Sequence, residues 1–369
     1  MKANFYLPIL KSKLGEFTAL SHLDNALISE IAPLFEVTPL EWDQTERTKP
    51  RTLDEHLDSF CKKFIAKWNN SNCFIDTHWL KWNGKDNTHK IQYVFDRLAT
   101  KKLYPIPIIG IGYSEEFIGY IMHLKQKNSL SEIGLRVNPN DVTNPEFGLN
   151  ITTLLAKINF SANDCNLIFD LADSNFSEVE NIAESIVGIL EEFPLLPEWK
   201  SFTIVGTAFP ASRSIKEGTS TFQRNDWNFY KLLLKKISTK PYNRNINYGD
   251  YSIVNPEYFE FNPKIMKASA NIRYTHDDKW LVAKGKALAK ASDYLQYKKL
   301  AKDIFNSVYF LGAPYSKGDS HLVRCVKGQE KPGAPSIWNW VGNNHHFTKV
   351  IRDLSILNRQ PDENDDPEA

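Results

Sequence analysis

Short apolar runs occur eight times along the first two-thirds of the sequence, and stretches with helical periodicity lie between most of them. Near-continuous apolar runs are typical of parallel strands whose two faces are both covered. Parallel neighbours need a crossover connection, usually a helix, so the pattern indicates an α/β architecture. The eight runs are Phe5–Leu10, Ile31–Val37, Cys73–His78, Tyr104–Ile111, Ile133–Val137, Cys165–Ala172, Phe202–Phe209 and Asn247–Val254.

The stretches between these runs are predicted to be amphipathic helices. In Leu53–Trp68, Phe60 and Phe64 fall on one helical face, and Thr52 with Glu55 has the spacing of a capping box. The other predicted helices are Ile91–Leu98, Glu115–Leu124, Phe147–Ile158, Val179–Leu190 and Asp226–Ile237. Eight such units in a row favour a (β/α)8 barrel of the TIM type. The alternative is a doubly wound open sheet, although no GxGxxG motif opens the chain.

The pattern changes after the eighth run. The segment 272–283 predicts a β-hairpin, and a last amphipathic helix is expected near His346–Leu357. On this interpretation a long insertion separates the eighth strand from its helix and covers the carboxyl ends of the strands. The predicted units are a barrel of residues 1–261 with 345–360, an α+β insertion of residues 262–344, and a disordered acidic tail of residues 361–369.

The composition is that of an ordinary globular protein, and it limits the partners that we expect. The chain has 45 Lys and Arg against 44 Asp and Glu. This balance argues against a protein that coats nucleic acid, because counterion release needs a surplus of cations. The cysteines form no CxxC pair, so we expect reduced thiols in a cytoplasmic protein. The N-terminal residues do not resemble a signal peptide, and no apolar run has membrane-spanning length, so we expect no membrane partner.

Charged residues interrupt several of the apolar runs near their ends. They are Glu36 in the second run, Asp76 and His78 in the third, Arg136 in the fifth, Asp170 in the sixth and Asp250 in the eighth. Active groups of a (β/α)8 barrel cluster at the carboxyl ends of the strands. A charge among apolar residues is costly to bury alone, so it needs an ion pair, a metal or a polar ligand. Two interpretations stay open: these residues pair with one another, or some of them face a ligand.

Carboxylates together with Lys and Arg are the groups that phosphoester hydrolysis uses. The predicted acid–base carboxylates are Glu36, Asp76, Asp170 and Asp250, of which the first three are also candidate ligands of Mg²⁺. The predicted anion-binding residues, which would hold a small-molecule or nucleotide phosphate, are Lys11, Arg136 and Arg213. Gly110 and Gly112 follow the fourth run and are expected to leave room for a ligand. Carbohydrate or aldol-type chemistry fits such a barrel mouth equally well, whereas no HExxH, GxSxG or P-loop motif is present.

A histidine pair, His345 and His346, is the most distinctive polar feature of the C-terminal part. It follows Gly342-Asn343-Asn344 and is expected at the start of the last helix, at the same end of the barrel as the strand-end charges. We predict that His346 assists proton transfer, with His78, Asp319 and His345 in supporting roles. The alternative is a capped helix start with one histidine packed under a loop.

The sequence also resembles the Beta protein family, which is named for a phage protein. The matching segments are Tyr6–Lys13, Gly15–Phe17, Ala19-Leu20, Pro33–Val37, Phe74–Asp76, Gly318-Asp319, Gly333–Trp338 and Asn344–His346. The resemblance extends over nearly the whole chain, and it implies a functional role for Lys11, Glu36, Asp76 and His346. It also implies a cytoplasmic protein of phage and bacterial genomes with a part in phage–host conflict or antiviral defence. It supplies no reaction and no substrate.

Three functions are therefore weighed for this sequence. The first is a metal-dependent, phosphodiesterase-like hydrolase with a carboxylate-rich site in the barrel mouth. The second is a non-catalytic barrel scaffold that binds or senses a phage protein or another protein partner. The third is a nucleic-acid binder, which needs a continuous basic stripe despite the neutral total charge.

Overall fold

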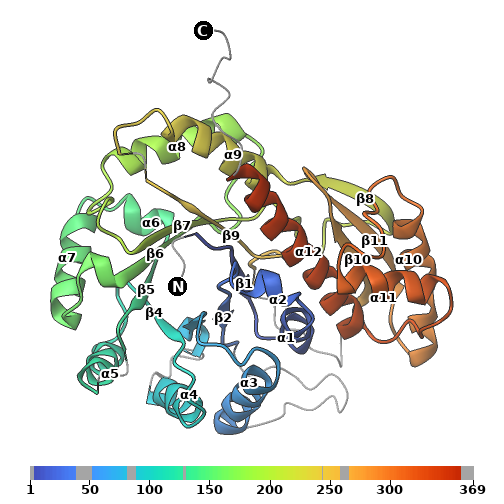
Figure 1. Cartoon of the computed structure of the whole chain (residues 1–369), viewed down its shortest axis with the longest axis horizontal. Coiled ribbons are helices and arrows are strands. Elements are labelled where there is room, and N and C mark those ends of the chain that lie inside the picture. The colour runs from blue at the N-terminus through green and yellow to red at the C-terminus, as the bar shows by residue number, and fades with distance from the viewer. Residues whose placement is uncertain are drawn as a thin grey trace.

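Eight parallel strands close into a barrel in the computed structural model of the chain, and helices surround them (Figure 1). The structure describes residues 4–38, 52–80, 89–127, 130–242, 244–257 and 266–358, with the backbone alone for 89–91. The barrel strands are β1 (Leu7–Leu10), β2 (Leu34–Glu36), β3 (Phe74–Asp76), β4 (Ile106–Gly110), β5 (Ile133–Val137), β6 (Cys165–Asp170), β7 (Ser201–Val205) and β9 (Asn247–Asp250). The predicted barrel is confirmed, and the open sheet is excluded because β1 pairs with both β2 and β9.

The helices of the barrel follow the predicted amphipathic segments closely. They are α1 (Leu14–Ser21), α2 (Asn25–Ile28), α3 (Leu53–Lys67), α4 (His89–Ala99), α5 (Glu115–Gln126), α6 (Pro139–Val142), α7 (Phe147–Ile158), α8 (Val179–Glu191) and α9 (Asn225–Ile237). Local capping fixes where α3 and α5 begin, because Thr52 and Ser114 each accept a hydrogen bond from a backbone N–H three residues on. The sequence pattern does not predict the short helices α1 and α2.

The interior of the barrel is filled by side chains that alternate along the strands. Leu7 and Ile9 of β1, Leu34 of β2, Phe74 of β3 and Ile108 of β4 belong to this buried inner cluster. Their neighbours in the chain point outward and pack against the helices, as the two-residue period of a strand requires. The apolar layer fills the lower part of the barrel, so the polar residues at the strand ends lie above it.

A second layer of structure stands beside the barrel (Figure 1). It contains an antiparallel sheet in the order β10 (Ser269–Thr275), β11 (Lys279–Ala287) and β8 (Gly218–Gln223), with the helices α10 (Gln296–Phe305) and α11 (Lys317–Val326). The predicted hairpin corresponds to β10 and β11. Strand β8 comes from the segment between β7 and α9, ahead of the predicted insertion, and pairs with β11.

The last helix, α12 (Pro335–Leu357), joins this layer to the barrel. It packs against α1 of the barrel and against β10 and α11 of the second layer. The helix begins well before the predicted start, so His345 and His346 lie in its interior and not at its beginning. Gly342 suggests a loop in the sequence, but here it allows close packing: a Cβ atom on it would lie 2.8 Å from the carbonyl oxygen of Arg273.

The predicted unit boundaries stay a prediction. The boundary proposed between residues 344 and 345 falls inside α12, and the acidic tail 361–369 lies outside the described residues. Among the helices that the structure describes, none combines the length and apolar character that crossing a membrane requires.

Gly249 tests the tightness of the barrel interior. A Cβ atom there would lie 2.5 Å from Cγ2 of Val205 and 2.9 Å from the carbonyl oxygen of Leu7. Because the second contact is with backbone, we expect Gly249→Ala to lower the free energy of unfolding by about 1–3 kcal/mol in denaturant titrations. The control is Gly119→Ala on the exposed face of α5, where nothing lies within 4 Å and a stabilisation of about 0.5–1 kcal/mol is expected. Equal effects of the two substitutions would contradict this packing.

Candidate functional site

One arginine, Arg136 of β5, binds three carboxylates at the carboxyl ends of the strands. Its Nη1 donates to Oε1 of Glu36 at 2.9 Å and to Oδ2 of Asp76 at 2.7 Å. Its Nε and Nη2 donate to Oδ2 of Asp170 at 3.0 and 2.6 Å. Tyr251, just after β9, completes the group because its hydroxyl accepts from Nη2 at 2.9 Å and donates to the same Asp170 oxygen at 2.6 Å. We call these five residues the mouth cluster.

Strand register explains why residues so far apart in the sequence meet. Glu36 and Asp76 are direct partners in the parallel ladder between β2 and β3. Arg136 is the last but one residue of β5 and Asp170 is the last residue of the neighbouring strand β6, so both lie at the carboxyl ends of their strands. Each charged residue lies two positions after a residue that faces the barrel interior. Because side chains alternate between the two faces of a strand, its own side chain points into the barrel as well.

Burial makes the charges of the mouth cluster depend on one another. The side chain of Arg136 is 15% exposed, and those of Glu36 and Asp76 are almost fully buried. Burial alone would lower the pKa of Arg136, but Tyr251 and the three carboxylates reverse the effect and raise that pKa well above its ordinary value. Burial also works to raise the pKa of Asp76, yet His78 and Arg136 outweigh it and hold that pKa below its ordinary value. Mutual pairing therefore describes Arg136 and the carboxylate oxygens that it meets.

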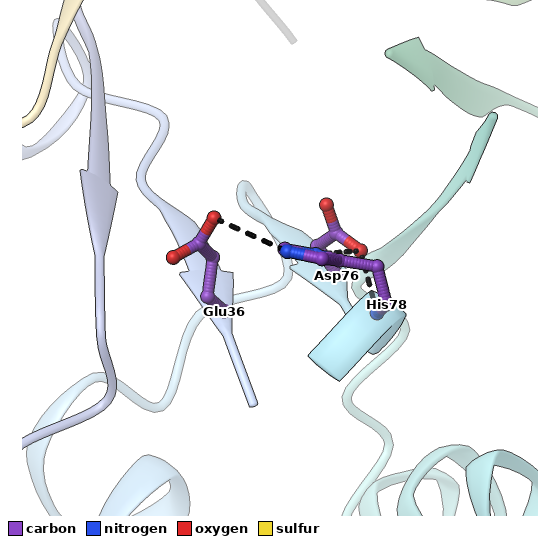
Figure 2. Close-up of side chains that lie close together, drawn as sticks. All are labelled: Glu36, Asp76 and His78. Atoms are coloured by element: carbon purple, nitrogen blue, oxygen red, sulfur yellow. Dashed lines mark hydrogen bonds and ion pairs between the residues drawn. The ribbon is translucent and has the colours of Figure 1, made fainter. Parts of the chain in front are cut away.

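One carboxylate oxygen in the mouth cluster differs from the rest. Among the residues that the structure describes, no hydrogen-bond donor meets the buried Oε2 of Glu36. Figure 2 shows that Glu36 faces Asp76 and His78, which lies in the short 3-10 turn after β3 (His78–Leu80). Nδ1 of His78 lies 3.0 Å from Oδ1 of Asp76, and Nε2 lies 4.0 Å from Oε1 of Glu36. The His78 side chain is 30% exposed, so this part of the group reaches solvent.

The predicted anion-binding residues are placed differently from the expectation. Arg136 uses its donors on carboxylates and Tyr251, as described above, so it offers no free fork to a phosphate. Lys11 is nearly buried, and its Nζ donates to the carbonyl oxygens of Pro256 and Glu257 at 3.0 and 2.9 Å. Arg213 lies exposed in the turn after β7. The room that was expected beside Gly110 is filled by the ring of Tyr113, whose hydroxyl donates to Asp76 at 3.3 Å.

Asp250 and His346 form a second polar group on the outer side of the barrel wall, away from the inward-facing Tyr251. Asp250 accepts from the hydroxyl of Tyr6 at 2.6 Å and lies 2.9 Å from Nε2 of His346. Nδ1 of His346 lies 2.7 Å from the hydroxyl oxygen of Thr275 in β10. Because consecutive strand residues point to opposite faces, β9 sends Tyr251 into the mouth and Asp250 toward α12. The expectation that Asp250 and His346 join the mouth carboxylates is corrected by this arrangement.

The other predicted supporting residues, Asp319 and His345, belong to the seam between α12 and the second layer. Nδ1 of His345 lies 2.8 Å from Oδ2 of Asp319 in α11, and Nε2 lies 2.7 Å from the carbonyl oxygen of Thr275. Tyr274 donates to Asp319 at 2.8 Å and stacks on the His345 ring. All of these side chains are buried, so they hold α12 to β10 and α11. Of the predicted supporting residues, only His78 lies near the mouth cluster.

Sequence reasoning overlooks two tyrosines that the mouth uses. Tyr251 follows β9, the last strand of the barrel, and Tyr113 lies in the turn before α5. Both contact mouth carboxylates through their hydroxyls. An aromatic residue beside an apolar strand reads as core, so its polar tip carries no signal in the sequence.

Comparison with known proteins gives a family and distant structural likenesses. A model of the Beta protein family matches residues 6–352. No curated protein matches the chain. Among solved structures, the catalytic domain of a chitinase from Pyrococcus furiosus is 10% identical with a TM-score of 0.37, and covers 68% of this chain and 84% of its own. The triosephosphate isomerase of Bartonella henselae is 13% identical with a TM-score of 0.34, and covers 69% of this chain and 94% of its own.

The burial of His346 predicts how the free energy of unfolding depends on pH. Burial lowers the pKa of His346, against the opposing effect of Asp250, while Arg224 and His345 lower it further. The unfolded chain then binds more protons below about pH 6.5, so the free energy of unfolding falls as the pH drops, by at most about 1.4 kcal/mol per pH unit for one histidine. Denaturant titrations from pH 7 to pH 5 should show a smaller fall for His346→Gln than for the wild type. Parallel curves for the two proteins would contradict the assignment.

Proposed function

The chain belongs to the Beta protein family, and we propose that this member is a hydrolase whose active site is the mouth cluster with His78. The observation that carries the proposal is the buried Glu36 carboxylate, whose Oε1 is held by Arg136 and whose Oε2 has no donor among the described residues. A carboxylate fixed at one oxygen and without a partner at the other is suited to accept a proton from a water molecule that enters the mouth. The mouth also lies where barrels of this type carry their reacting groups.

The other two carboxylates are better suited to positioning than to proton transfer. Oδ2 of Asp170 already accepts from Arg136 and Tyr251, and its Oδ1 accepts from the backbone N–H of Ala172 at 2.9 Å. Oδ1 of Asp76 accepts from the backbone N–H of His78 at 3.0 Å. Both therefore fix the geometry of Arg136 and His78. Glu36 and His78 remain as the acid–base pair, because one has an available oxygen and the other reaches solvent.

The reaction that we propose is hydrolysis of a phosphoester. A water molecule gives its proton to Oε2 of Glu36 while its oxygen forms a bond to phosphorus. The bond from phosphorus to the leaving oxygen breaks, and protonated His78 returns a proton to that oxygen. Three carboxylates against one guanidinium give the mouth a formal charge of −2 when His78 is neutral, so a phosphate needs a cation between itself and the carboxylates.

A non-catalytic scaffold is the second candidate, and one observation favours it. Every nitrogen of the Arg136 guanidinium has a partner within the protein, which is the pattern of a structural ion cluster. On this alternative the barrel would present a surface to a protein partner. A part in phage–host conflict or antiviral defence is the setting that the family resemblance implies, and we propose it for either candidate.

Substitution of Glu36 separates the two candidates. We expect Glu36→Gln to lower kcat for hydrolysis of bis(4-nitrophenyl) phosphate, measured with Mn²⁺ present, by at least about 100-fold, because the amide cannot accept the proton. Circular dichroism checks that the variant is folded. The matched control is Glu115→Gln on the exposed start of α5, which should keep wild-type turnover. Wild-type protein that hydrolyses neither this diester nor the corresponding monoester would contradict the hydrolase and favour the scaffold.

A further inference from the structure

We propose that Glu36, Asp76 and His78 bind a divalent transition-metal ion, of the Zn²⁺ or Mn²⁺ class, at the rim of the mouth cluster. The ion deepens the hydrolase function, and its use in catalysis rests on that function: with an ion bound, Glu36 and His78 would act as its ligands and not as the acid–base pair, and the ion would supply the activated water. Its binding stands on geometry alone, so the two can be tested apart. The residues come from β2, from β3 and from the turn that follows β3.

The three side chains converge closely enough to share one ion. One ligand atom from each lies within 4.8 Å of the other two, and Figure 2 shows them facing a common space. Ligand atoms at about 2.0–2.2 Å from a metal are about 3–4 Å apart, so small rotamer adjustments would close the shell. The partial exposure of His78 leaves the solvent side open, as a catalytic metal site requires.

The hydrogen bonds of the mouth cluster fix both carboxylates, and a bound ion would share Oδ1 of Asp76 with the backbone N–H of His78 and the hydroxyl of Tyr113. Arg136 holds Oε1 of Glu36 and Oδ2 of Asp76, and so fixes both carboxylates from the barrel side. In Figure 2 the oxygen of Glu36 that faces His78 is Oε1, whereas Oε2 is buried and lacks a donor among the described residues. A buried carboxylate oxygen without a partner is costly, and a bound cation removes that cost.

Charge and donor type define which ion fits. A divalent cation neutralises the formal charge of −2 that the carboxylates and Arg136 leave in the mouth. An imidazole nitrogen among the ligands favours transition metals over Mg²⁺, which prefers oxygen ligands throughout. Asp170, one of the candidate ligands in the sequence, does not belong to the group of converging ligand atoms among the described residues, in which His78 takes its place.

Metal binding can be measured without any substrate. Full-length protein is stripped with a chelator and titrated with Zn²⁺ by calorimetry, and with Co²⁺ by visible absorption, which reports the ligand geometry. We expect one ion per chain, and at least about 10-fold weaker binding in His78→Gln and in Glu36→Gln. His123→Gln, on the exposed face of α5, is the matched control and should bind like the wild type. A large excess of Mg²⁺ should leave the Co²⁺ spectrum unchanged.

The possible outcomes distinguish a failure of the metal site from a failure of the proposed hydrolase function. Wild-type protein that binds neither ion, or folded His78→Gln that binds as well as the wild type, overturns the metal site. Hydrolysis that persists in chelator-treated protein without Co²⁺ binding overturns the metal site and leaves the hydrolase standing. Binding as expected with no turnover of any phosphoester supports the metal site and overturns the hydrolase.

Discussion

The guanidinium of Arg136 is the countercharge on which the mouth of this barrel depends. Three carboxylates converge at the ends of β2, β3 and β6, where apolar strands leave little water to solvate them. Without a cation among them they would repel one another and resist burial. Arg136 meets all three at hydrogen-bond distance because the planar guanidinium offers donors in several directions, which a lysine does not. The position of Glu36, and hence its available oxygen, follows from this one interaction.

A second set of buried polar contacts closes the fold at the other face of the same strands. His345 and His346, consecutive in α12, pair with Asp319 and Asp250, and both contact Thr275. Helix α12 is thereby fixed both to the barrel and to the sheet of β8, β10 and β11. Because β9 sends Asp250 to this seam and Tyr251 to the mouth, the two polar regions are neighbours along the chain but lie on opposite sides of the barrel wall.

The barrel and most of its helices could be predicted from the sequence, because apolar runs and helical periodicity are local signals. The convergence of Glu36, Asp76, Arg136 and Asp170 was also accessible, since a charge inside an apolar strand needs a partner. The contacts of Asp250 and His346 could not be predicted from the sequence. They depend on which face of β9 Asp250 occupies, and on a helix whose first residues have the sequence of a loop. Strand β8 was missed because its alternating polar sequence pairs only with β11, far along the chain. The near-zero net charge of the whole chain does not indicate the charge of the mouth, where three carboxylates and one guanidinium leave a surplus of negative charge.

The unfolding free energies of four proteins test the role of Arg136 most directly: the wild type, Arg136→Met, the triple variant Glu36→Gln, Asp76→Asn and Asp170→Asn, and the combination of both changes. If Arg136 is the countercharge of the mouth, Arg136→Met should cost about 3–5 kcal/mol in the wild-type background, because it leaves buried charges without a partner. In the neutralised background the same substitution should cost clearly less, about 1 kcal/mol or below. Equal losses in the two backgrounds would contradict this account.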